Sequence, residues 1–319
     1  MAQSGRITRT DLLKVAQVLR GEQTGNLLIF GLVIAVGALI SEMFLSGPNL
    51  LNVLRQMSVT GILAIGMTFV IITAGIDLSV GSIVGLVTVI AAAAQPLGIP
   101  AVIVIGLVTG VVVGAANGIG VALGRIPPFI MTLATLYVVR GVAFLYSGGL
   151  PKYGVSEDFI HLGNGTTLGV PNAVICFAGL LVVGGVLLKL TRFGRYVFAI
   201  GSNQEAARLS GVSIETHTIL AYVLSGTFAA VGGLIYTSQL GIGVALAGQG
   251  YELDAIAAVA VGGTSFYGGH GSIVGTFFGA GIIAIGNNLL NLTGVDPLLQ
   301  DFVKGLIIIS AVLLNRSRR

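Results

Sequence analysis

One long stretch of this sequence is almost free of charge. Across residues 58–123 the only charged side chain is Asp77, and polar turns interrupt the stretch at residues 73–79 and 95–100. A helix of about 20 apolar residues crosses the hydrocarbon core of a bilayer, so this stretch is expected to hold three crossings. Of all 319 residues, 55% are hydrophobic and 9% are charged, against about 25% charged in soluble domains. The sequence therefore predicts an all-α, polytopic membrane protein.

Ten membrane crossings are expected along the chain, some of them short or broken. Residues 26–45 make the first and the stretch at 58–123 makes three, whereas the segment at 50–57 is expected to be too short to cross. The other six are residues 129–146, 172–188, 218–240, 253–261, 272–291 and 297–314. The domain organisation is then a cytoplasmic head at 1–24, a single transmembrane domain at 25–315 and a basic cytoplasmic tail at 316–319.

The distribution of charge predicts the orientation. With the N-terminus inside, the head, Arg125, the loop at 190–217 and the tail lie in the cytoplasm and hold most of the 16 Lys and Arg residues. This is the positive-inside pattern, and it accounts for the net charge of +4 without a nucleic-acid partner. Arg140, near an outer span end, is expected to snorkel towards the headgroups. Glu252 and Asp254 are expected to begin a short helix at the outer face.

The loop at 190–217 contains a segment with helix start and stop signals. Ser202 and Glu205 have the spacing of a capping box, residues 204–209 are mostly good helix formers, and Gly211 is a suitable terminator. The simpler alternative is a solvated basic loop. A short, well-terminated helix at the membrane surface instead suggests a rigid lever that another protein can push.

No enzymatic or metal-binding motif occurs in the sequence. It has no phosphate-binding P-loop, paired-cysteine motif or HExxH, and the single Cys176 lies in an apolar run. His161, His217 and His270 are isolated and lack ligand spacing. We therefore expect no catalytic residues, no metal and no cofactor, and a source of energy outside this chain.

Glycines recur at four-residue spacing in the expected fourth span, at Gly106, Gly110, Gly114 and Gly118. They give one helix face without side chains. Such a face is typical of close packing between helices of one subunit. A surface that slides during transport is the alternative.

Three motifs together resemble the permease subunits of ribose-type ABC sugar importers, in the branched-chain amino acid/ribose permease superfamily. They are GMTFVIITAGIDLSVGS at 66–82, TRFGRYVFAIGSNQEAARLSGV at 191–212 and GYELDAIAAVAVGGTSFYGGHGSIVGT at 250–276. The resemblance implies a bacterial inner-membrane homodimer with cytoplasmic ATP-binding cassette subunits and a periplasmic sugar-binding protein. It also implies a fold similar to the membrane domain of vitamin B12-type (type II) importers, with about ten transmembrane helices.

The resemblance implies a role for the loop at 190–217. In such importers the matching loop carries the coupling helix that docks on the ATPase. The residues expected to serve this coupling are Arg195, Asn203, Glu205, Ala206, Ala207, Arg208, Leu209 and Gly211. Ala206, Ala207 and Leu209 are expected to be its apolar contacts.

Polar side chains within the apolar runs are the candidates for a translocation pathway. An intramembrane carboxylate is a functional candidate by default, but Asp77 also lies in a turn where it could cap the next helix. Amides suit sugar hydroxyls and interhelical hydrogen bonds equally well. The amide candidates are Asn117, Asn287, Asn288 and Asn291.

Two other functions stay open on the sequence. One is an ABC permease for another small polar solute, such as a branched-chain amino acid or a polyol. The other is a secondary transporter, which also uses broken helices and glycine-rich turns. A secondary transporter would need intramembrane acids or histidines for ion coupling, and the first half of the chain offers only Asp77.

Overall fold

A computed structural model of the protein describes residues 22–296, 299, 302, 305 and 306. The predicted last crossing at 297–314 falls largely outside the described residues, and most of the N-terminal head and all of the basic tail do so too. Within the described part the chain is mainly helical, with one two-stranded hairpin.

The helices form two groups by length. The long or apolar ones are α2 (Glu22–Ile40), α3 (Gly47–Ile72), α4 (Val80–Ala93), α5 (Ile99–Ala122), α6 (Pro128–Ser147), α8 (Asn172–Leu190), α11 (Ile214–Leu240), α12 (Tyr251–Val261) and α13 (Ile273–Leu292). The connecting elements are η1 (Gln95–Leu97), α7 (Glu157–Asn164), β1 (Thr166–Thr167), β2 (Val170–Pro171), α9 (Arg192–Ser202) and α10 (Gln204–Leu209).

Six helices of the described chain are long and apolar enough to cross a membrane: α3, α5, α6, α8, α11 and α13. The all-α, polytopic class predicted from the sequence is therefore confirmed. Helix α4 and residues 25–40 of α2 are apolar but shorter.

One predicted boundary is wrong. Residues 50–57 are not a separate short segment but the first turns of α3, which runs unbroken to Ile72. Pro48 does not end a helix here, because it lies in the first turn of α3, where a missing N–H costs nothing. The later breaks at 73–79 and near 95–98 lie where the polar turns predicted them.

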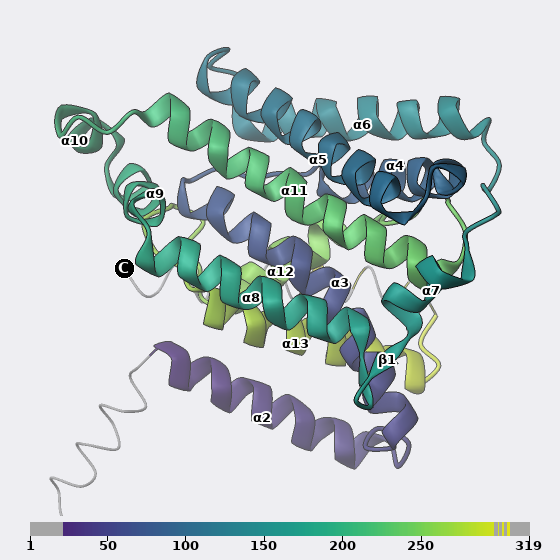
Figure 1. Cartoon of the computed structure of the whole chain (residues 1–319). Coiled ribbons are helices and arrows are strands. Elements are labelled where there is room, and N and C mark those ends of the chain that lie inside the picture. The colour runs from purple at the N-terminus through teal and green to yellow at the C-terminus, as the bar shows by residue number, and fades with distance from the viewer. Residues whose placement is uncertain (1–21, 297–298, 300–301, 303–304, 307–319) are drawn as a thin grey trace, which may run out of the picture.

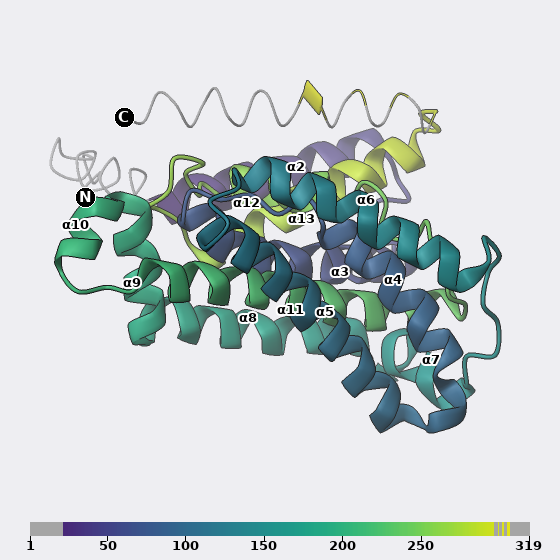
Figure 2. The ribbon, with the colours of Figure 1, turned by 90° about the horizontal axis from the view of Figure 1, so that it is seen from above.

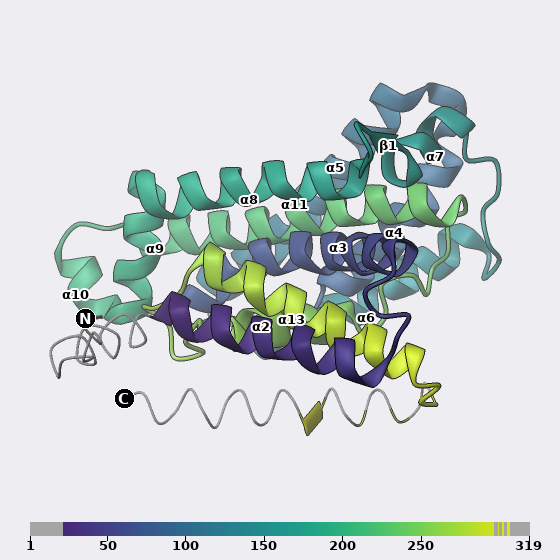
Figure 3. The ribbon, with the colours of Figure 1, turned by 90° about the horizontal axis from the view of Figure 1, so that it is seen from below.

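Long helices cross the molecule side by side, and their connections gather at its two ends (Figure 1). Helices α9 and α10 lie at one end, here named the α10 end, whereas α7 and the hairpin lie at the other, the α7 end. The views from above and below show the same separation (Figures 2 and 3). Helix α3 runs through the centre, and neighbouring parts of the chain bury 89% of its apolar 18-residue stretch.

The glycine-lined face of α5 packs against α11. A Cβ atom on Gly110 would overlap the carbonyl oxygen of Gly226, and one on Gly114 would overlap that of Tyr222. The two backbones can therefore touch only because these side chains are absent. Close packing within one subunit is confirmed as the structural role of these glycines.

Candidate functional site

The loop at 190–217 folds into two helices rather than one. Helix α9 begins after Thr191, whose side-chain oxygen accepts a hydrogen bond from the Gly194 N–H at 3.2 Å. It is amphipathic: Val197 and Ile200 are buried, whereas Arg195 is exposed. Helix α9 was not predicted from the sequence, although basic and apolar residues alternate along it at helical spacing, which is the signal of an amphipathic helix.

Helix α10 spans the residues predicted for it, 204–209, but its cap lies one residue later than predicted. Its cap is Asn203, whose Oδ1 accepts a hydrogen bond from the Ala206 N–H at 2.9 Å. The predicted capping box at Ser202 is wrong, because Ser202 is the last residue of α9 and its hydroxyl donates to the Phe198 carbonyl. The predicted terminator is confirmed: Gly211 has a φ of +81°, which only glycine adopts without strain.

Helix α10 has one side against its own chain and one side free. Ala207 is buried against Ile200 and Ile214, whereas Leu209 is 82% exposed. Ala206 is also exposed. The prediction that Ala207 contacts a partner therefore needs correction, since its methyl group already anchors α10 to the subunit.

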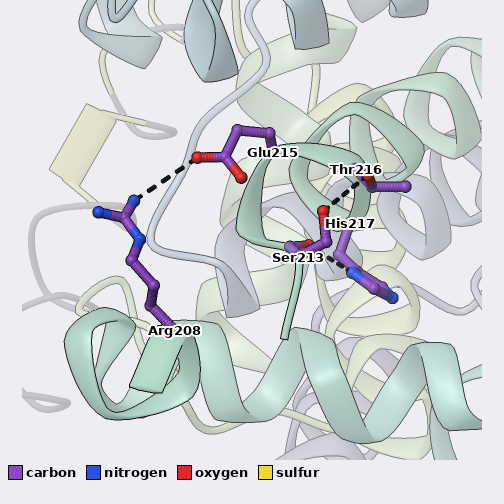
Figure 4. A network of polar contacts seen from close by, with 5 residues as sticks. All are labelled: Arg208, Ser213, Glu215, Thr216 and His217. Atoms are coloured by element: carbon purple, nitrogen blue, oxygen red, sulfur yellow. Dashed lines mark hydrogen bonds and ion pairs between the residues drawn. The ribbon is translucent and has the colours of Figure 1, made fainter. Parts of the chain in front are cut away.

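Polar contacts connect α10 to the start of α11 (Figure 4). Arg208 forms an ion pair with Glu215 at 3.6 Å. Nδ1 of His217 is hydrogen-bonded to the Ser213 carbonyl at 2.6 Å, and its ring packs edge-on against Tyr196 of α9. These contacts make α9, α10 and the first turn of α11 one unit.

Asp77 lies at the centre of a buried polar network between α3 and α4. Its Oδ1 accepts hydrogen bonds from the N–H and the hydroxyl of Ser79, at 3.0 and 2.6 Å, and from the Asn117 amide at 3.4 Å. Its Oδ2 accepts one from the Ser225 hydroxyl at 2.8 Å. The carboxylate thus closes the turn before α4 and joins that turn to α5 and α11. These contacts support the capping alternative; a transport role for Asp77 stays a prediction.

Sequence comparisons identify the protein family of this chain. Residues 49–312 match the family described as "Branched-chain amino acid transport system / permease component". The chain belongs to this permease family. It is 42% identical to the ribose import permease protein RbsC of Haemophilus influenzae, over 89% of this chain and 90% of that protein. It is 43% identical to RbsC of Bacillus subtilis, over 91% of each.

A third relative is named for a different sugar. The permease is 37% identical to the D-allose transport system permease protein AlsC of Escherichia coli K12, over 92% of each chain. No solved structure matches the permease. Its family consists of transport components, in agreement with the prediction that the chain is not an enzyme.

The predicted amide candidates of the permease have separate surroundings. Asn288 exchanges two hydrogen bonds with Asn49 of α3, at 2.7 and 3.0 Å, so it serves interhelical bonding. Asn287 donates to Asp254 at 3.3 Å, and Asn291 is exposed. Asn117 belongs to the Asp77 network, so the structure does not bring these candidates into one site.

One prediction about a charged residue is wrong in the permease. Arg140 does not snorkel: its guanidinium donates to the carbonyls of Ala245 and Ala247, at 2.5 and 2.9 Å. Helix α12 begins beside the first turn of α4, where the Glu252 carboxylate lies against Gly81; its position at the outer face stays a prediction. The sequence could not reveal either contact, because both join segments far apart in the chain.

Proposed function

We propose that this chain is the membrane-spanning permease subunit of an ABC importer that moves a ribose-like monosaccharide across the bacterial inner membrane. A separate ATPase drives the transport and a periplasmic binding protein delivers the sugar. The observation that carries this proposal is 42–43% identity to two ribose import permeases over about nine-tenths of each chain. Because a relative named for D-allose is nearly as similar, we propose a monosaccharide as the substrate class and D-ribose as the first sugar to test.

The unit formed by α9 and α10 is the proposed contact for the ATPase. Leu209 and Ala206 are its apolar contact residues, since both are exposed on α10. Ala207 holds the helix on the subunit from the other side. Arg195, Asn203, Glu205, Arg208 and Gly211 shape or flank the same helix. Because α10 is fixed at both ends, it can transmit a movement of the ATPase to the permease without bending.

The proposed assembly is a homodimer of subunits with ten membrane helices, similar to type II importers, and with both termini in the cytoplasm. The described helices α2, α3, α4, α5, α6, α8, α11, α12 and α13 account for nine of these, and the predicted tenth, residues 297–314, falls largely outside the described residues. Helix α2 begins at the α10 end (Figure 3), which supports a shared side for the N-terminus and the coupling unit. Single cysteines at 150–170 should label from outside, and those at 195–210 only from inside.

Uptake of labelled D-ribose tests the proposed function. The chain, with its ATPase and binding protein, is expressed in cells that lack their own ribose permease. We expect ribose uptake that unlabelled ribose suppresses and leucine does not. Suppression by leucine instead of sugars would assign the chain to amino acids, and no uptake of any sugar would contradict the proposal.

A further inference from the structure

The chain between α11 and α12 runs back into the molecule without forming a helix. This re-entrant segment, residues 241–250, starts at the α7 end, where Gly243 and Lys152 exchange two backbone hydrogen bonds of 2.8 Å. It then follows α4: the hydroxyl of Thr88 bonds both the N–H and the carbonyl of Val244. A Cβ atom on Gly81 would overlap the carbonyl oxygen of Gly248.

These contacts place the segment deep within the helical layer. Helix α4 ends at Ala93 on the α7 side, because Gln95 bonds Ser156 next to α7. At 1.5 Å per residue, the helix from Gly81 to Ala93 is about 18 Å long. The hydrocarbon core of a bilayer is about 30 Å thick, so a segment that follows α4 from the α7 end to Gly81 extends over more than half of that thickness.

The backbone of the segment is held by side chains from other helices. Arg140 of α6 donates to two of its carbonyls. Glu252 accepts a hydrogen bond from the Gly250 N–H at 3.2 Å and so closes the turn into α12. Ala245 and Ala247 are buried, and their carbonyl oxygens lie against Gly85 of α4. The segment is therefore built into the fold as a strip of consecutive turns rather than as a loose loop.

The other side of the strip is open. Leu246 is 53% exposed and Leu253, one turn into α12, is 47% exposed; Gln249 between them is exposed as well. Irregular backbone at membrane depth is tolerated only where protein buries it or where it lines a water-filled cavity. We therefore expect the open side to meet protein or water rather than lipid.

From this geometry we infer that the re-entrant segment lines the aqueous path of the transported solute, with Gln249 as a hydrogen-bonding group for sugar hydroxyls. The inference rests on the proposed function for the identity of the solute. An amide donates and accepts hydrogen bonds at once, as a hydroxyl does, so one side chain can bind a sugar that passes in several orientations. Broken helices near the bilayer midplane are the usual place for such contacts in transporters.

Cysteine accessibility tests whether the segment faces water. In the full complex with Cys176→Ala, single variants Leu246→Cys, Gln249→Cys and Leu253→Cys are treated with a membrane-impermeant thiosulfonate. Only a thiolate reacts, and a thiol in lipid stays protonated. We expect all three to react in at least one nucleotide state. The matched control, Val182→Cys, is 67% exposed in the middle of α8 and should stay unreacted.

Transport then tests the role of Gln249. Losing one hydrogen bond to the sugar should lower ribose uptake by Gln249→Leu about tenfold, with part of it restored in Gln249→Asn. ATP hydrolysis stimulated by the binding protein should persist, which a merely misfolded variant would not show. Three unreactive cysteines in complexes that still take up ribose would overturn the inference and show that protein covers the strip. Reactive cysteines in a complex that carries no sugar would instead contradict the proposed function alone.

Discussion

At the scale of single residues, Asp77 offers the sharpest distinction between a structural and a transport role. Asp77→Asn keeps one carbonyl oxygen for Ser79, and its new amide can donate to Ser225, whose hydroxyl can rotate to accept. We therefore expect the variant to fold and to retain appreciable ribose uptake. Thermal unfolding of the purified subunit and uptake in cells measure the two effects.

The matched control is Asp77→Leu, which leaves the buried donors of Ser79 and Ser225 without their acceptor. Each unsatisfied buried donor costs about 1–3 kcal/mol, so this variant should unfold at a clearly lower temperature. Loss of uptake in Asp77→Asn, with assembly and thermal stability unchanged, would show that the carboxylate acts in the path and not in the turn.

Residue-level predictions succeeded where the reason was local. Gly211 was predictable because a helix that ends with a left-handed residue favours glycine. The cap was misplaced by one residue because α9 had not been predicted, and Ser202 looked free to cap α10. The inward face of Ala207 depends on Ile200 and Ile214, which belong to other helices, so the sequence of α10 alone could not reveal it.

At the scale of elements, the glycine face of α5 predicts that two similar substitutions differ clearly in their effect on stability. Gly110→Val would press a branched side chain into the Gly226 backbone, and overpacking of this kind costs about 1–3 kcal/mol. Gly179→Val in α8 meets nothing within 4 Å. The first variant should lower the unfolding temperature and the second should leave it near that of the native protein. Equal stability of the two would contradict the packing of α5 on α11.

Helix α10 carries the element-scale prediction for coupling. Leu209→Asp places a charge on the exposed face proposed to meet the ATPase, where an unpaired buried charge is strongly unfavourable. The ATPase should be lost from the purified complex, and uptake should fall with it. Leu168→Asp is the matched control, since Leu168 is 99% exposed at the opposite end of the molecule. Normal ATPase binding by Leu209→Asp would show that α10 is not the coupling contact.

Apolar periodicity predicted most long helices and failed at three connections. It separated residues 50–57 from α3, because Pro48 was taken as a break rather than a helix start. It missed α9, whose charged face looked like a loop. It also treated residues 241–250 as a plain loop, since nothing in these residues reveals that Arg140 and Thr88 hold them against α6 and α4.

At the scale of the whole molecule, the two ends differ in the kind of surface they present. The α10 end has exposed Arg192 and Arg195 beside the exposed Leu209. The α7 end carries Glu157 and Asp158 in the first turn of α7. This polarity agrees with the orientation predicted from the positive-inside pattern, with the α10 end in the cytoplasm. The partners expected at each end follow from it in turn.

The central claim is that a separate ATPase drives sugar transport through this permease, and reconstitution measures ATP-driven transport most directly. The permease, its ATPase and the sugar-loaded binding protein are placed in liposomes, and D-ribose accumulation is followed with and without ATP on the ATPase side. We predict accumulation that needs all three proteins and ATP hydrolysis. Accumulation by this chain alone, driven by a proton or sodium gradient and indifferent to ATP, would contradict the account.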